Sequence, residues 1–154
     1  LTWDDPAPRS ERTAKLSGLE VLRLMVAGEL PQPPMAHLMD IRLIDVENGR
    51  AVFTGTPAEF HYNPLGTVHG GFGATLLDSA MGCAEHSTLG AGDAYTTLEL
   101  KINFLRPQQG RVKAGGASSP SPGPWPTPSW PRCGPRRVGN TSISGRPSVP
   151  CPRS

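Results

Sequence analysis

One carboxylate in an apolar stretch is the side chain of this sequence with the clearest capacity for chemistry. Asp78 lies in a predicted helix that runs from Gly70 to about Thr88. Burial of a carboxylate is costly unless the group is paired, hydrogen-bonded or functional. Asp78 is therefore a candidate catalytic residue, or alternatively a helix residue that faces solvent or a structural partner. Its apolar and small neighbours in the helix are Phe72, Ala74, Leu76, Leu77, Ala80, Met81, Cys83 and Ala84.

The start of the same helix is the second candidate for chemistry. Gly70 and Gly71 open it, and the first N–H groups of a helix have no partner within the helix. The helix macrodipole adds partial positive charge there, and glycine allows a ligand to approach the backbone closely. Such donors suit an oxyanion that develops on a carbonyl carbon. An ordinary turn at the start of a helix would also explain the two glycines.

The spacing of these two candidates predicts a pair of chains. Gly70 and Asp78 are eight residues apart, which separates them by about 12 Å along a helix axis. One carbonyl group cannot contact both residues of the same helix. If two such helices lie antiparallel across a two-fold axis, Asp78 of one meets Gly70 of the other. We therefore expect a dimer with two composite sites.

The segments before this helix must hold it in place. The spacing of Leu19, Leu22 and Val26 predicts a helix within residues 16–30, which the prolines after residue 30 would end. One further helical turn is expected at residues 35–40. Next come two predicted strands, residues 41–47 and 50–59, joined at Asn48-Gly49, and then a loop over residues 60–68. The Asn-Gly pair is a strong hairpin signal because both turn positions favour positive φ.

Another strand is predicted after the helix. Residues 94–105 (AYTTLELKINFL) alternate between an apolar and a polar face, which is typical of a half-buried strand. Arg106-Pro107 would end this strand, and residues 111–114 could begin another.

The composition changes abruptly at about Gly115. The segment SSPSPGPWPTPSWPRCGPRR places proline at nearly every second position, which no central strand tolerates. Too few large apolar residues follow to offset the entropy of ordering the chain. We expect a flexible arm at residues 1–15, one domain at 16–115 and a disordered Pro/Ser/Arg-rich tail at 116–154. Our hypothesis for the tail is translation out of frame.

Composition restricts the classes of function. The chain of 154 residues suits one domain, and its net charge of +2 gives no indication of a nucleic-acid or membrane partner. Cys83, Cys133 and Cys151 form neither a CxxC pair nor an even disulfide framework. No signal peptide is recognisable at the N-terminus, and no stretch approaches ~18 apolar residues. We expect a cytoplasmic protein.

Several of these features occur together in one known group of enzymes. Asn63, the run GTVHGG at residues 66–71, Asp78 and the segment TTLELKINFLRP resemble the PaaI-like (phenylacetate-degradation) group of hotdog-fold acyl-CoA thioesterases. The resemblance covers roughly residues 18–115. It implies an α+β hotdog fold, a curved antiparallel sheet wrapped around a long central helix, in a dimer or a dimer of dimers. The last strands of that fold would be missing here or replaced by the disordered tail.

The resemblance also implies catalytic roles. Asp78 would act on the thioester carbonyl as general base or nucleophile, and the Gly70 N–H of the second subunit would polarise that carbonyl. Asn63 would position the water or the carbonyl, and Thr97 would assist the water. His69 would bind near the thioester or orient the loop, and a purely structural role is the alternative for it.

Gly71, Phe72 and Arg106 are the expected substrate-binding residues. Arg106 could contact the CoA phosphates, or it could be an ordinary solvated arginine. The implied reaction converts an acyl-CoA and water into a carboxylic acid and free CoA, with no metal or redox cofactor. The apolar side chains that could line a pocket for an aromatic or medium-chain acyl group are Phe60, Tyr62, Leu65, Phe72 and Leu76.

Three alternatives remain open from the sequence. A hotdog hydratase or dehydratase would use His69 or the Glu85-His86 pair for proton transfer. A non-catalytic acyl-CoA-binding module, or an inactive remnant, would bind without hydrolysis. A zinc site could use His61, His69, Glu85 and His86, but their spacing matches no usual zinc pattern.

Overall fold

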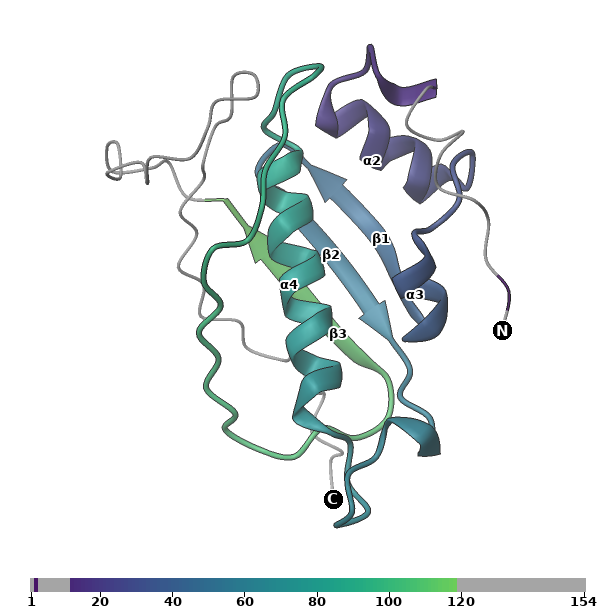
Figure 1. Cartoon of the computed structure of the whole chain (residues 1–154), viewed down its shortest axis with the longest axis vertical. Coiled ribbons are helices and arrows are strands. Elements are labelled where there is room, and N and C mark those ends of the chain that lie inside the picture. Colours follow the sequence, from purple (N-terminus) through teal and green to yellow (C-terminus); the bar gives the residue numbers. More distant parts are fainter. Residues whose placement is uncertain (1, 3–11, 119–154) are drawn as a thin grey trace, which may run out of the picture.

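The structure, a computed structural model, describes residue 2 and residues 12–118 (Figure 1). A sheet of three antiparallel strands carries one long helix across one face, with smaller helices beside the first strand. This arrangement is the predicted α+β class. The elements in chain order are α2 Gly18–Ala27, α3 Pro34–Leu38, β1 Ile41–Glu47, β2 Arg50–Gly55, the 3-10 helix η1 Glu59–His61, α4 Gly70–His86 and β3 Val112–Ala117.

Helix α2 confirms the first predicted helix and has well-defined ends. The Ser17 hydroxyl accepts a hydrogen bond from the Glu20 N–H, and the Glu20 carboxylate accepts from both the hydroxyl and the N–H of Ser17. This capping box satisfies donors that the helix cannot. The hydrogen bond from the Ser17 side chain is the main cause that lowers the pKa of the Glu20 carboxyl. Gly28, with φ of +78°, ends the helix in the left-handed region.

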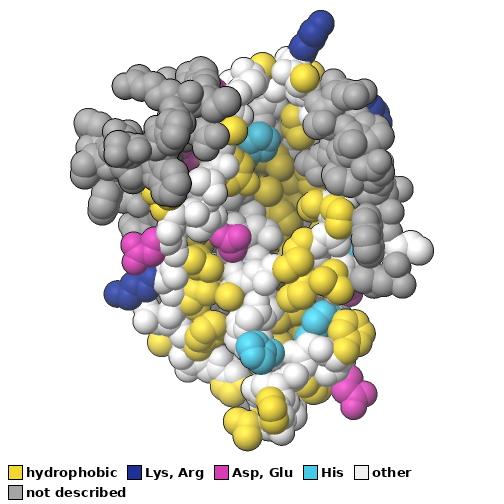
Figure 2. All heavy atoms as spheres, viewed as in Figure 1, with side chains coloured by type: hydrophobic (Ala, Val, Ile, Leu, Met, Phe, Trp, Pro, Cys, Tyr) yellow, Lys and Arg dark blue, Asp and Glu magenta, His cyan; other side chains and the backbone are white. Residues whose placement is uncertain are grey.

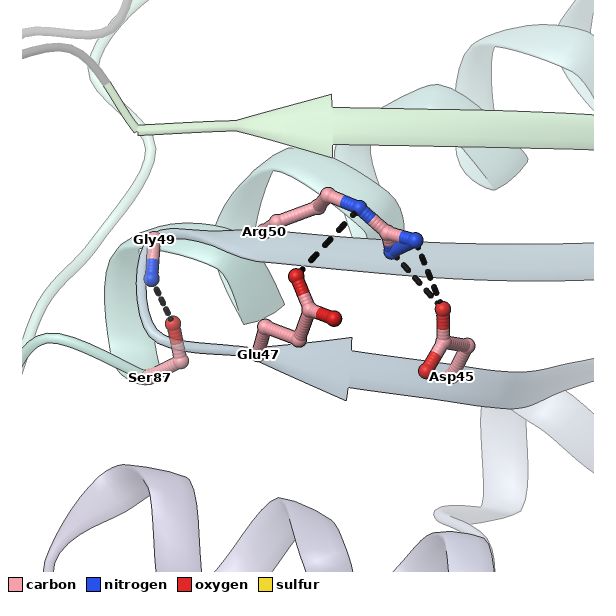
Figure 3. A network of polar contacts seen from close by, with 5 residues as sticks. All are labelled: Asp45, Glu47, Gly49, Arg50 and Ser87. Carbon is pink, nitrogen blue, oxygen red and sulfur yellow. Dashed lines mark hydrogen bonds and ion pairs between the residues drawn. The ribbon is translucent and has the colours of Figure 1, made fainter.

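The predicted hairpin forms between β1 and β2, which pair antiparallel. Arg50 at the start of β2 donates to Asp45 on β1 at 2.7 Å, and the Gly49 N–H donates to the Ser87 hydroxyl at 2.7 Å (Figure 3). The turn differs from the prediction in one respect. Gly49 has positive φ, but Asn48 does not, since Asp40 is the only non-glycine with positive φ among the described residues.

Strand β2 is shorter than predicted. It ends at Gly55 and does not continue to residue 59. Pro57 follows closely and has no N–H to donate to a neighbouring strand, and η1 then begins at Glu59.

Helix α4 confirms the predicted central helix and packs on β2 and β3 (Figure 1). All of its residues are buried or half-buried within a single chain. The contact with β3 is very close at Gly116, where a Cβ atom would lie 2.1 Å from the Ala80 carbonyl oxygen. Glycine at this position therefore sets how near the helix lies to the sheet. The α4 side chains buried in the core are Phe72, Leu76, Ala80, Met81 and Ala84.

The strand predicted at residues 94–105 does not form. This segment has no ladder partner among the described residues, although its sequence alternates. It runs beside α4, on the side of the helix away from β1 (Figure 1). An extended segment becomes a strand only where a neighbouring strand takes its N–H and C=O groups. β3 pairs with β2, and no described strand pairs with its other edge.

The predicted C-terminal tail and the expected absence of a membrane-spanning helix concern more than these elements. The tail predicted for residues 116–154 falls largely outside the described residues, because the description ends at Ser118 and β3 continues to Ala117. No helix of residues 12–118 is both long enough and apolar enough to cross a bilayer.

Candidate functional site

The N-terminus of α4 offers a free backbone donor. His69 caps the helix, because its Nδ1 accepts the Gly71 N–H at 2.8 Å and its carbonyl oxygen accepts the Phe72 N–H at 3.0 Å. The Gly70 N–H forms no hydrogen bond with the described residues. A ligand oxygen could therefore accept from Gly70 at the positive end of the helix dipole.

His69 is a cap in this structure. A Cβ atom on Gly71 would lie 2.9 Å from the His69 Nδ1, so the absence of a side chain at position 71 lets the imidazole fold back over the helix. The His69 N–H also donates to the His61 carbonyl oxygen at 2.8 Å, which ties the loop to η1. These contacts support the structural reading of His69. An imidazole that accepts through Nδ1 carries its proton on Nε2 when neutral.

The structure brings Asp78 and Thr97 into contact, whereas the predicted role of Thr97 in assisting the water stays a prediction. The Thr97 hydroxyl donates to the Asp78 carboxylate at 2.9 Å, across 19 residues of sequence. Asp78 is half-buried on α4, and Thr97 lies on the extended segment beside that helix. One carboxylate oxygen therefore accepts a hydrogen bond from Thr97, and the remaining lone pairs of the carboxylate can accept from a water molecule or a substrate.

The segment that carries Thr97 follows α4 in the antiparallel direction. The Tyr95 hydroxyl oxygen would lie 2.8 Å from a Cβ atom on Gly82, and the Phe104 ring would lie 3.3 Å from one on Gly70. Glycines at both ends of α4 thus let residues 95–104 approach the helix closely. Phe104 lies directly beside the free N–H donor at the helix start.

Asn63 organises its own loop. Its side-chain oxygen accepts from the N–H groups of Leu65 and Thr67, and its amide nitrogen donates to the Thr67 hydroxyl at 2.9 Å. The backbone of Asn63 adds a hydrogen bond from its N–H to the Thr67 carbonyl oxygen at 2.8 Å. Both ends of the amide are therefore engaged within residues 63–67. The predicted role of Asn63 in positioning water or the carbonyl stays a prediction.

The expected substrate-binding residues lie in different surroundings. Phe72 is only 2% exposed and packs in the core, with its ring centroid 4.9 Å from that of His61 and its Cζ close to Gly55. Arg106 is exposed and lines a pocket beside α4. Of the apolar side chains expected around the acyl group, Phe60 and Leu65 are strongly exposed, whereas Leu76 is buried.

The two catalytic candidates on α4 remain separate within one chain. Gly70 and Asp78 stand about 12 Å apart along the axis of the 17-residue helix. The Asp78 carboxylate accepts a hydrogen bond from Thr97, and the Gly70 N–H has no acceptor among residues 12–118. A site that uses both groups on one carbonyl needs a second chain.

Sequence reasoning missed Gln108. This glutamine follows Arg106-Pro107, and its side chain is buried against Gly73 of α4. Nothing in the sequence distinguishes it from the adjacent Gln109, which is exposed. Only the packing of the segment on α4 singles it out.

No group of three or more His, Cys, Asp or Glu side chains that could hold a metal ion occurs within residues 12–118. His61 is engaged through Nδ1 with the Ala58 N–H at 2.9 Å, and its ring stacks beside Phe60 and Phe72. The zinc alternative therefore gains no support from the geometry.

Comparison with known proteins relates the chain to one superfamily. Residues 65–113 match the Thioesterase superfamily. Over 69 residues the chain is 38% identical to a protein of Saccharolobus solfataricus that is named provisionally as an esterase, and the match covers 45% of this chain and 49% of that protein. The chain thus spans about half the length of this relative.

Solved structures extend the match to the fold. A phenylacetic acid degradation-related protein from Ralstonia eutropha JMP134, provisionally a thioesterase, is 29% identical with a TM-score of 0.56, over 61% of this chain and 74% of that chain. The PaaI protein from the E. coli phenylacetic acid degradation operon is 26% identical, with a TM-score of 0.54. The match covers 64% of this chain and 71% of that chain. The antiparallel sheet and its helix are those of the hotdog-type thioesterases.

Proposed function

Because this chain is related to the hotdog-type thioesterases, we propose that it hydrolyses an acyl-CoA thioester to a free carboxylic acid and CoA. Asp78 acts as general base on water or as nucleophile on the thioester carbonyl carbon. The water oxygen ends on the acid, and the proton ends on the departing CoA thiol. The hydrogen bond from Thr97 to Asp78 carries the proposal, because it orients a half-buried carboxylate on α4, the helix whose first residue, Gly70, offers a backbone N–H donor.

The proposed enzyme is a homodimer, or a dimer of dimers, with two composite sites. Gly70 of one chain donates its N–H to the thioester oxygen, while Asp78 of the other attacks the carbonyl carbon. The separation of about 12 Å along one helix supports this arrangement, since one carbonyl cannot reach both ends. A backbone N–H at a helix start stabilises the oxyanion without reorganisation during the reaction.

The proposed acyl group is aromatic or of medium length. Support comes from the apolar side chains near the start of α4 and from the names of the similar proteins, two of which refer to phenylacetic acid degradation. Figure 2 shows hydrophobic side chains gathered on both sides of α4 over the lower part of this face.

The test is release of free thiol from phenylacetyl-CoA and from octanoyl-CoA. The unaltered chain should hydrolyse at least one of them, and Asp78→Asn should lose at least about 100-fold in kcat because the amide is not a base. Ser79→Ala, which alters the next residue of the same helix, is the matched control and should keep its rate. Hydrolysis that survives Asp78→Asn would exclude the proposed mechanism.

A non-catalytic acyl-CoA-binding module is the second candidate. The observation in its favour is Phe104, whose ring lies against Gly70 where the thioester oxygen would have to approach. Binding of acyl-CoA that is unchanged by Asp78→Asn, together with absence of thiol release from either protein, would establish this alternative.

A further inference from the structure

The turn between β1 and β2 consists of Asn48 and Gly49, a residue pair that can modify itself. Asn48 is exposed, and its side chain forms no hydrogen bond with the described residues. Gly49 follows it with φ of +76°. In an Asn-Gly pair the glycine nitrogen can attack the asparagine side chain, because glycine has no side chain to obstruct the approach. The turn that closes the hairpin is therefore also a chemically reactive pair.

The reaction of this pair is a deamidation that needs no enzyme. The Gly49 nitrogen forms a bond to the Asn48 Cγ, the bond from Cγ to Nδ2 breaks, and ammonia leaves with the proton of the Gly49 N–H. Water then opens the cyclic imide at either of its carbonyl groups, which gives aspartate or isoaspartate. Both products add a negative charge to the turn, and isoaspartate also adds a methylene group to the backbone.

The fold holds the attacking nitrogen in place. The Gly49 N–H donates to the Ser87 hydroxyl oxygen at 2.7 Å (Figure 3). Ser87 is only 3% exposed, and its own hydroxyl proton is donated to the Ala84 carbonyl oxygen at 2.6 Å. A hydroxyl has a single proton, so only lone pairs of Ser87 face Gly49. The Gly49 N–H is therefore fixed against a buried acceptor at the end of α4.

The peptide group on the other side of Gly49 is held as well. The Gly49 carbonyl oxygen accepts from the Ser118 N–H at 2.7 Å, and the side chain of Arg50 donates to Asp45 at 2.7 Å. Attack requires the Gly49 nitrogen to turn toward the Asn48 Cγ. That rotation breaks the hydrogen bond to Ser87, so the reaction requires a local opening between the hairpin and α4.

We propose that Asn48-Gly49 is a deamidation site that the folded chain keeps unreacted through Ser87. The modification occurs in those chains in which the end of α4 has come away from the hairpin, so its rate follows the population of that open state. Ser87 takes no part in the proposed hydrolysis of thioesters. The inference is therefore independent of the proposed function.

The test follows the loss of Asn48 by peptide mapping with mass spectrometry, at mildly alkaline pH. The unaltered chain should react slowly in buffer and much faster in urea that unfolds it. Ser87→Ala should react about tenfold faster than the unaltered chain in buffer, because the hydrogen bond that restrains Gly49 is lost. In unfolding urea the two chains should react at the same rate.

Thr88→Val is the matched control. It removes a hydroxyl from the next residue, which donates to the Glu85 carbonyl oxygen and does not contact the Gly49 N–H. Its rate of deamidation in buffer should equal that of the unaltered chain. The unfolded fraction of each variant, measured by urea denaturation, is used to subtract the deamidation that occurs in unfolded chains.

A second measurement keeps the inference testable if Ser87→Ala does not fold. In the unaltered chain, low concentrations of urea should raise hydrogen exchange of the Gly49 N–H and deamidation of Asn48 in the same proportion, because both need the same opening. Exchange that rises without deamidation would overturn the inference. So would equal corrected rates for Ser87→Ala and the unaltered chain, or a folded chain that reacts as fast as in unfolding urea.

Discussion

The contact between Thr97 and Asp78 is the residue-scale feature on which the proposed chemistry depends most. The Thr97 hydroxyl donates to one carboxylate oxygen of Asp78 and thereby restricts rotation of the carboxylate. We expect Thr97→Val to lower kcat about tenfold, with KM little changed, because the carboxylate is then free to rotate.

Two variants separate this effect from a general loss of packing. Thr97→Ser keeps the hydroxyl and should retain most of the rate. Thr96→Val, at the neighbouring exposed position, changes the same kind of side chain without touching Asp78. Steady-state kinetics with phenylacetyl-CoA measure kcat and KM of each variant. A low kcat for Thr97→Ser would show that the methyl group of Thr97 matters more than its hydrogen bond to Asp78.

Asn63 is the second residue whose contacts lead to a prediction. Its side chain forms hydrogen bonds with Leu65 and Thr67 and so holds the loop of residues 63–67 together. Asn63→Ala should lower the free energy of unfolding by about 1–2 kcal/mol, because it leaves those groups without their partner. Urea denaturation measures the change. Asn63→Asp keeps a side-chain oxygen that can accept from the N–H groups of Leu65 and Thr67, so it should recover part of the stability.

At the scale of the elements, the most important feature is the short distance between α4 and β3. Gly116 meets the Ala80 carbonyl oxygen so closely that an added methyl group must push the helix away, whereas nothing lies within 4 Å of a Cβ atom on Gly115. Gly116→Ala should therefore lower the free energy of unfolding by about 1–3 kcal/mol or more.

Gly115→Ala is the matched control for this prediction. It makes the same chemical change one residue earlier, in the same strand and on the opposite face. Its stability in urea should remain close to that of the unaltered chain. If both variants are equally destabilised, the intrinsic preference of the strand for glycine, and not the contact with α4, sets the stability.

At the scale of the whole molecule, the question is whether two chains share each site. Asp78→Ala and Gly70→Pro should each be inactive, the second because proline has no N–H to donate. Proline suits the first helical position, and His69, with ψ of 136°, already has the conformation that precedes a proline.

Mixing these two inactive proteins should restore activity. In a mixed dimer, one site combines both defects and the other has an intact Asp78 and an intact Gly70. Random re-pairing should therefore recover about a quarter of the original rate, since half of the dimers are mixed and each has one working site. Thiol release after mixing that stays at the level of the separate proteins would show that no site is shared.

The sequence by itself determined the local features of this protein. The bounds of α2 and α4 and the position of the β1–β2 hairpin follow from caps, glycines and short-range patterns, which depend on residues close along the chain. The motif from Asn63 to Asp78, together with the segment TTLELKINFLRP, was also the basis for predicting the family relationship and the fold class, and it supplied the candidate residues of the site.

Only the tertiary structure decided the features that depend on distant partners. Alternation in residues 94–105 predicted a strand, but a strand needs a neighbour to pair with, and the described residues provide none. The resemblance implied that Thr97 assists the water, but nothing in the sequence predicted its hydrogen bond to Asp78, and nothing predicted the burial of Gln108. Both arise because this unpaired segment packs along a glycine-containing helix, where backbones can approach closely.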